Sequence, residues 1–162
     1  MSKKRNDEIY EQRIIDALKR LPKVIYDKKH NLNIHIEDDQ CRSNETRFEH
    51  IAKKYHELKV RDIEAIPKGI NCYLKYSVSL ELKETYYYYI RRKGEDKGFI
   101  QVAVKLYEGE TTEAYVKTIF ITHRIKRISF IKKFDIMSLP KVENQCATTT
   151  HLVKGGYGVP GC

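Results

Sequence analysis

Hydrophobic and polar residues alternate along the middle of the chain, and this period of two predicts β-strands. Four segments show the alternation, at 70–76, 85–92, 99–107 and 114–122. The loops between them are short and polar, which favours an antiparallel order of neighbouring strands. The last two segments flank a loop rich in Glu, Gly and Thr, a pattern typical of a β-hairpin.

The same alternation predicts which side chains share a face of the sheet. Aliphatic residues at every second position of 99–107 mark the face that packs on the core. Along the last strand, strict alternation places Thr118 and Thr122 on one face beside Phe120. Lys117 is then expected on the opposite face, among isoleucines.

The first half of the chain has helical periodicity instead. Residues 7–21 place Ile and Leu side chains on one face, and a proline stops the run. Two short strands, at 23–26 and 32–36, are expected next, joined by a polar turn. A short helix at 60–66 is expected to end at Pro67.

Between these segments, a helix capped by Ser43 or Asn44 carries two histidines. Its apolar stripe consists of Phe48, Ile51, Ala52, Tyr55 and Leu58. At about 100° per residue, His56 lies at the margin of this stripe. His50 and Lys53 lie on the polar side, toward water.

Together these elements predict an α+β protein whose N-terminal helices pack on a four-stranded antiparallel β-sheet. Residues 1–43 are expected to form an extension of one helix and a β-hairpin, and residues 44–137 the main domain. Within that domain, 123–137 fit a helix and a strand equally well. The composition shifts at residue 138, and 138–162, which contain Cys and many Gly residues, are expected to form a flexible tail.

Charge and composition narrow the function. The net charge of +9 favours a polyanion such as nucleic acid, or an acidic protein partner. We expect no membrane partner, because no apolar run reaches the length of a membrane span. The N-terminus lacks a signal peptide and the four cysteines form no Cys-x-x-Cys pair, so we expect free thiols in the cytoplasm. Without metal-binding or phosphate-loop motifs, neither a metal nor a cofactor is expected.

The chain contains the residue types that cleave RNA without a metal ion. That reaction needs a base for the 2′-hydroxyl, an acid for the leaving 5′-oxygen and cations for the phosphate. His56 is the preferred acid–base candidate, because a helix-edge imidazole reaches both interior and solvent and titrates near neutral pH. The alternative is that His56 only flanks the core stripe.

Aromatic and basic residues supply candidates for RNA binding. Tyr87, Tyr89 and Arg91 share one face of a strand, where rings can stack on bases beside a guanidinium. The alternative is an ordinary aromatic strand with exposed arginines. The remaining RNA-binding candidates are His50, Lys53, Lys117 and Arg124.

Five short segments carry a family resemblance: 50–56, 62–67, 89–91, 98–100 and 117–122. They read as a His-bearing helix, a helix ending near Pro and a closing strand with a Thr-x-Phe-type end. This order resembles the barnase–EndoU–colicin–RelE-like superfamily of ribonuclease toxins, in the branch found in phages and mobile elements. The resemblance covers roughly residues 44 to 126, and the N-terminal extension and the Cys/Gly tail do not match it.

The resemblance implies metal-independent RNA cleavage that leaves a 2′,3′-cyclic phosphate. It implies His56 as acid and base, Arg91 as phosphate stabiliser, and Thr118 or Thr122 as an active-site hydroxyl. The expected function is then a toxin-like endoribonuclease acting on tRNA or mRNA, with an acidic antitoxin or host protein as a second partner. The alternative is a non-catalytic basic module that binds RNA or a protein of a phage or its host.

Overall fold

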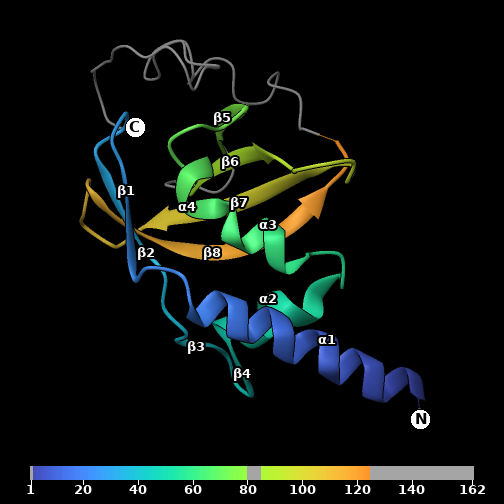
Figure 1. The fold of residues 1–162 in the computed structure, drawn as a ribbon. Coiled ribbons are helices and arrows are strands. Elements are labelled where there is room, and N and C mark those ends of the chain that lie inside the picture. Colours follow the sequence, from blue (N-terminus) through green and yellow to red (C-terminus); the bar gives the residue numbers. More distant parts are fainter. Residues whose placement is uncertain (1, 80–84, 125–162) are drawn as a thin grey trace.

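The computed structural model describes residues 2–79 and 85–124, which form an α+β fold (Figure 1). The first half contains α1 (Ser2–Lys19), β1 (Val24–Asp27), β2 (Leu32–His35), β3 (Gln40–Arg42), β4 (Glu45–Thr46) and α2 (Arg47–Lys54). The second half contains α3 (Val60–Glu64), α4 (Ile66–Gly69), β5 (Lys75–Val78), β6 (Thr85–Arg91), β7 (Phe99–Leu106) and β8 (Glu113–Thr122). The expected tail at 138–162 lies outside the described residues, as does 125–137.

The main sheet has six strands in the order β1-β2-β8-β7-β6-β5 and is mixed. The predicted antiparallel strands are present as β5 to β8, but the expectation of a four-stranded antiparallel sheet is wrong. The N-terminal hairpin joins the same sheet, because β2 pairs with β8 in parallel. Leu32 and Ile34 of β2 are buried by this pairing. Alternation within one segment cannot show which distant strand it will pair with.

The pairing of β7 with β8 contains a β-bulge that strict alternation does not predict. Ala103 pairs with Thr118 and Val104 pairs with Val116, so Lys117 is the extra residue of β8. Val116 and Ile119 both face the buried core. Lys117 therefore shares the opposite face with Thr118, and the prediction that it lies with the isoleucines is wrong.

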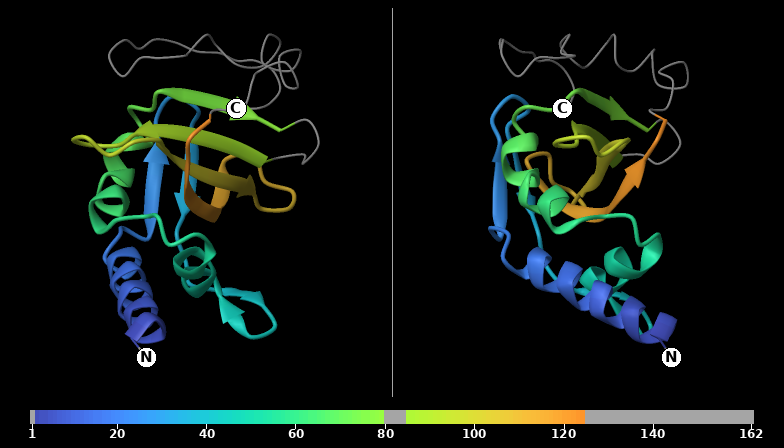
Figure 2. Two further views of the ribbon diagram at one scale, coloured as in Figure 1. Left: turned by 90° about the vertical axis from the view of Figure 1, so that its right-hand side faces the viewer. Right: turned by 45° about the vertical axis from the view of Figure 1, so that its right-hand side comes forward.

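The helices and the core lie on one face of the sheet. The aliphatic residues predicted for β7 are buried, with Ile100, Val102 and Val104 at 0 % exposure. α1 packs against α2 and α3, and α2 packs against β8. Figures 1 and 2 show α1 and α2 side by side below the sheet, on the side where the chain begins.

Two local interactions set helix boundaries that differ from those expected. Thr46, and not Ser43 or Asn44, caps α2, because it forms a capping box with Glu49. Pro67 does not end a helix but lies in the first turn of α4, where a missing N–H costs nothing.

A buried ion pair joins α3 to the end of the sheet. Arg92 Nη2 donates to Asp62 Oδ2 at 2.7 Å and Arg92 Nε donates to Asp62 Oδ1 at 3.0 Å. Both side chains are at most 5 % exposed. Asp62 also accepts from the backbone N–H of Lys59, at 2.8 Å, and so begins α3. Arg92 further donates to the Lys97 carbonyl at 2.7 Å, which fixes the loop between β6 and β7.

Replacing Asp62 with Ala is expected to lower the free energy of unfolding by about 3 kcal/mol, because the buried Arg92 loses the carboxylate that accepts two of its hydrogen bonds and, among the described residues, keeps only the Lys97 and Glu57 carbonyls and the more distant Asp96 carboxylate. Urea unfolding followed by circular dichroism measures the loss. The control is Arg61→Ala, since Arg61 makes an exposed ion pair with Asp96 and such pairs contribute little. Equal losses in the two variants would contradict the role of the buried pair.

Candidate nucleic-acid interface

The face of the sheet opposite the core, here called the outer face, carries basic, aromatic and hydroxyl side chains. Strand pairing places Tyr87, Ala103 and Thr118 in one row across β6, β7 and β8. Lys105 and Tyr115 pair in the neighbouring row. Side chains that pair across strands lie on the same face, about 5 Å apart at Cβ, so these groups share one face, of which Ala103 in the middle is buried.

Four cations meet near the bulge, and we call them the cationic cluster. They are Arg47, Lys54, Lys105 and Lys117. Burial lowers the pKa of Lys117 from its ordinary value of 10.5, and the charges of Lys105, Arg47 and Lys54 lower it further. Like charges gathered on a partly desolvated surface attract an anion that neutralises them, and phosphate has the required charge.

Arg47, at the start of α2, connects the cluster to the edge of the sheet. Its guanidinium donates to both carboxylate oxygens of Asp39, at 2.9 and 3.1 Å, and to the Lys117 carbonyl at 3.1 Å. It also lies 5.4 Å from the centre of the Tyr115 ring. The Asp39 carboxylate raises the pKa of Arg47, which therefore stays charged. Its position on β8 is thus fixed by several contacts.

Aromatic rings border the cationic cluster. Tyr55 is 60 % exposed, and its ring packs edge-on against Phe120 with centroids 5.7 Å apart. The Lys54 ammonium lies over both rings, 5.1 Å from the Phe120 centroid. On the other side of the cluster, Tyr107 and Tyr115 lie 5.0 Å apart. Rings beside cations are the combination that holds unstacked bases and their phosphates.

His56 lies against α1. It follows the end of α2 with φ of 55°, in the left-handed region. Its Nε2 is 2.7 Å from Glu11 Oε2, its Nδ1 is 3.7 Å from Asp7, and its ring packs edge-on against Tyr10. The expected helix position at the margin of the stripe is therefore wrong, because α2 ends at Lys54.

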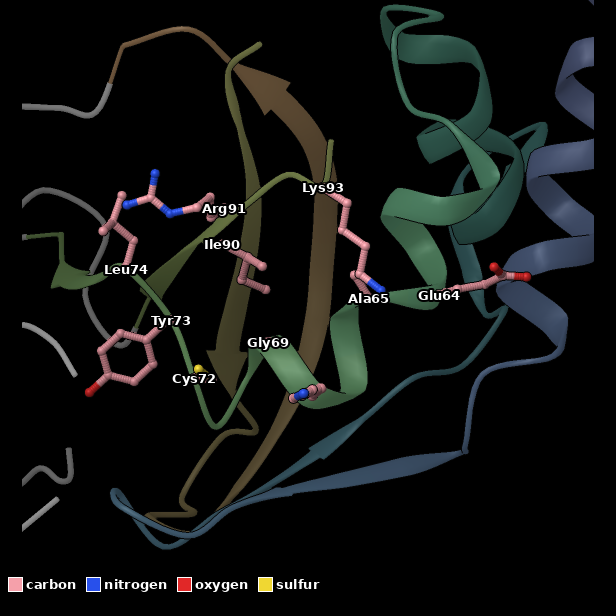
Figure 3. Close-up of a pocket in the computed structure, with 10 residues that line it drawn as sticks. Glu64, Ala65, Gly69, Cys72, Tyr73, Leu74, Ile90, Arg91 and Lys93 are labelled. Atoms are coloured by element: carbon pink, nitrogen blue, oxygen red, sulfur yellow. The ribbon is translucent and has the colours of Figure 1, made fainter. Parts of the chain in front are cut away.

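Arg91 and Thr122 share a row of the outer face. Both pair with Phe99, from opposite sides, so their Cα atoms are two strand spacings apart, about 10 Å. Arg91 also lines a pocket of about 600 Å³ at the exposed end of β6. Figure 3 shows this pocket, in which Ile90 lies close to Gly69. A side chain at Gly69 would collide with Ile90, at 2.7 Å, so α4 approaches β6 closely there.

The remaining predicted residues occupy different environments. Tyr87 is half-buried, but Tyr89 is only 1 % exposed and hydrogen-bonds Ser77, so the ring of Tyr89 is not open to a base. The Thr118 hydroxyl is buried and has no hydrogen-bond partner among the described residues. The Thr122 hydroxyl is occupied, since it donates to the Arg124 carbonyl at 3.0 Å.

The two candidates on α2 lie in different surroundings. His50 is half-buried, with Nδ1 3.3 Å from Glu45. Lys53 is exposed, as expected. The structure therefore brings Thr118 and Lys117 together with three cations that sequence reasoning missed, Arg47, Lys54 and Lys105. Lys105 could have been found from the sequence, because alternation along β7 places it on the non-core face. Arg47 and Lys54 could not, because they lie near β8 only through the packing of α2 on that strand.

Comparisons of the chain with protein-family models, curated proteins and solved structures found no match. Among the described residues, no helix has the length and apolar character needed to cross a membrane. The same residues contain no group of three or more His, Cys, Asp or Glu side chains arranged to hold a metal.

The cysteines differ from expectation. Cys41 is a free thiol, but Cys72 is disulfide-bonded, so the prediction of free thiols is wrong at Cys72. Spacing along the sequence does not show which cysteines meet in space, because disulfide formation depends on the distance between their Cα atoms in the fold.

Replacing Lys105 with Ala is expected to raise the pKa of Lys117 toward its ordinary value of 10.5, because one neighbouring positive charge is removed. An NMR titration of labelled lysine side chains measures the pKa directly. The matched control is Lys53→Ala, which removes an exposed lysine of the same helix face as His50. If the pKa of Lys117 stays the same in the Lys105→Ala protein, Lys105 is too far from Lys117 to belong to the cationic cluster.

Proposed function

We propose that this protein is a metal-independent endoribonuclease that holds single-stranded RNA on the part of the outer face around Lys117. The observation that supports the proposal is the gathering of three cations around Lys117, bordered by the rings of Tyr55, Phe120 and Tyr115. A row of cations follows a phosphate backbone, and the rings receive bases that have left the stack.

Single-stranded RNA fits this surface better than a duplex. The exposed Tyr55 and the half-buried Phe120 form an edge-to-face pair rather than a flat strip along a groove. Bases can stack on such rings only when they are splayed out, as in loops and single strands. The net charge of +9 adds a long-range attraction for the same ligand.

Cleavage in this proposal uses the lowered pKa of Lys117. An ammonium that releases its proton more readily than an ordinary lysine is a better general acid, and it also stabilises the charge on the phosphate. Lys105 supplies further positive charge, whereas the charge of Arg47 is paired with the Asp39 carboxylate. The Thr118 hydroxyl next to Lys117 is buried, so no contact with the phosphate is assigned to it.

The second candidate is RNA binding without cleavage. The observation that favours it is the position of His56, whose ring is held by Glu11 and Asp7 of α1 rather than by the outer face. Both candidates use the same surface, so binding and cleavage need separate measurements.

The double substitution Lys105→Ala with Lys117→Ala is expected to weaken binding of a fluorescent single-stranded RNA and to reduce its salt dependence. Each lost phosphate contact lowers the slope of log K against log salt by about 0.7. Fluorescence anisotropy at several salt concentrations gives both values. The control is Lys23→Ala with Lys28→Ala, two exposed lysines beside β1. An equal loss in this control would show that binding follows net charge and not the proposed surface.

In EDTA, the wild-type protein is expected to cleave a single-stranded RNA oligonucleotide and to leave a 2′,3′-cyclic phosphate end. The Lys117→Ala protein is expected to cleave at least about 100-fold more slowly, because general acid catalysis contributes that much or more. Mass spectrometry of the products and gel assays measure these outcomes. An RNA that is bound but never cut would favour the second candidate.

A further inference from the structure

A histidine of the N-terminal hairpin lies on the outer face beside the cationic cluster. His35 of β2 pairs in register with Tyr115 of β8, which in turn pairs with Lys105 of β7. Residues paired in this way share a face, so the His35 ring lies on the same surface as Lys105. The ring also packs edge-on against Tyr107, with centroids 5.6 Å apart. Its side chain is 27 % exposed and is open to a ligand.

The Glu113 carboxylate holds this imidazole in place. His35 Nε2 is 2.7 Å from Glu113 Oε1, and Asn33 Nδ2 donates to Glu113 Oε2 at 2.8 Å. The contact with His35, followed by that with Asn33, lowers the pKa of Glu113, so the carboxylate is ionised at neutral pH. An ionised carboxylate only accepts hydrogen bonds, which assigns the proton of neutral His35 to Nε2 and leaves a lone pair on Nδ1. Nδ1 makes no hydrogen bond to the described residues.

We propose that His35 Nδ1 is the base that takes the 2′-hydroxyl proton of RNA, and that Glu113 and Asn33 are positioning residues that orient it. The inference rests on the proposed function, since it assigns the base of that reaction. It replaces the sequence-based assignment of this role to His56.

The reaction then proceeds without a metal ion or another reactant. The 2′-oxygen forms a bond to phosphorus as its proton passes to His35 Nδ1. The bond between phosphorus and the 5′-oxygen breaks, and the Lys117 ammonium gives a proton to the departing oxygen. Water then takes the proton from His35 and returns one to Lys117, so the products are a 2′,3′-cyclic phosphate and a 5′-hydroxyl.

The distances between backbone positions allow one phosphate to meet both groups. Lys117 lies two residues beyond Tyr115 on β8, diagonally across from His35. β2 and β8 are parallel; strands in a sheet lie about 4.8 Å apart and two residues span about 6.6 Å along a parallel strand, so these two Cα atoms are about 8 Å apart. A phosphate between them is therefore within reach of the imidazole and of the long lysine side chain.

The other histidines of the described residues are engaged elsewhere. His30 is buried beside Asp27, His50 is next to Glu45, His56 is next to Glu11, and His123 is next to Glu57. His35 differs from them because the strands themselves connect it to Lys105 through Tyr115.

The test compares three variants of the full chain: His35→Gln, His56→Gln and His123→Gln. His123 is the matched control, because it is a surface histidine paired with a glutamate in the same way. His35→Gln is expected to lower single-turnover cleavage of a single-stranded RNA in EDTA by about 100-fold or more. It is also expected to remove the acid limb of the pH–rate profile, which a purely structural role would leave in place. Affinity for a DNA oligonucleotide of the same sequence, which has no 2′-hydroxyl, is expected to stay within about threefold, since a base contributes little to ground-state binding.

Two failures are distinguishable. If the wild-type protein cleaves RNA and His35→Gln cleaves it equally well with the same acid limb, the assignment of His35 is wrong while the proposed function stands. The same conclusion follows if His56→Gln alone abolishes cleavage. If the wild-type protein binds RNA but cleaves none, the proposed function is wrong and the assignment of a base is wrong with it. A His35→Gln protein that still binds the DNA oligonucleotide has folded, so its loss of cleavage supports the assignment.

Discussion

The pairing of β7 with β8 includes one extra residue at Lys117, and both faces of the sheet depend on this bulge. Upstream of it, Ala114 and Val116 face the core, and downstream of it Ile119 and Ile121 do. Without an extra residue, one of these pairs would turn to the solvent. The bulge keeps the core continuous, and its consequence is a lysine beside Thr118 on the outer face. The strand pairing itself thus places two members of the cationic cluster, Lys105 and Lys117, on the outer face.

The second half of β8 would otherwise be an open edge, because β2 pairs with it only as far as Tyr115. α2 covers this edge, and Arg47 donates to the Lys117 carbonyl that the bulge leaves without a strand partner. Covering an edge in this way protects a sheet against unwanted pairing. The packing of α2 on β8 also places Arg47, at the start of the helix, and Lys54 and Tyr55, at its end, beside the outer face. A requirement of folding therefore also assembles the basic and aromatic surface.

The sequence predicted the local parts of this arrangement better than the contacts between distant parts. The four central strands follow from alternation, and the core face of β7 follows from its aliphatic residues. The parallel pairing of β2 with β8 and the bulge have no local signal, because both are chosen by packing between segments far apart in the chain. The surface around Lys117 could not be predicted for that reason: Arg47 and His35 reach it from separate elements. The position of His56 was predicted wrongly because α2 ends at Lys54, two residues before His56.

His35 and His56 are superficially alike, since each is partly exposed and each contacts a carboxylate at 2.7 Å. Their surroundings differ in charge. His56 has two carboxylates beside it, those of Glu11 and Asp7, and these oppose the approach of a phosphate. Within the described ranges, His35 contacts one carboxylate, that of Glu113, the charges of Glu37 and Asp39 act on the Tyr107 ring beside it, and Lys105 lies in the same row of the sheet. In the proposed function, an RNA backbone bound at Lys105 and Lys117 meets the imidazole of His35 on its path, whereas it has to leave these cations to meet that of His56.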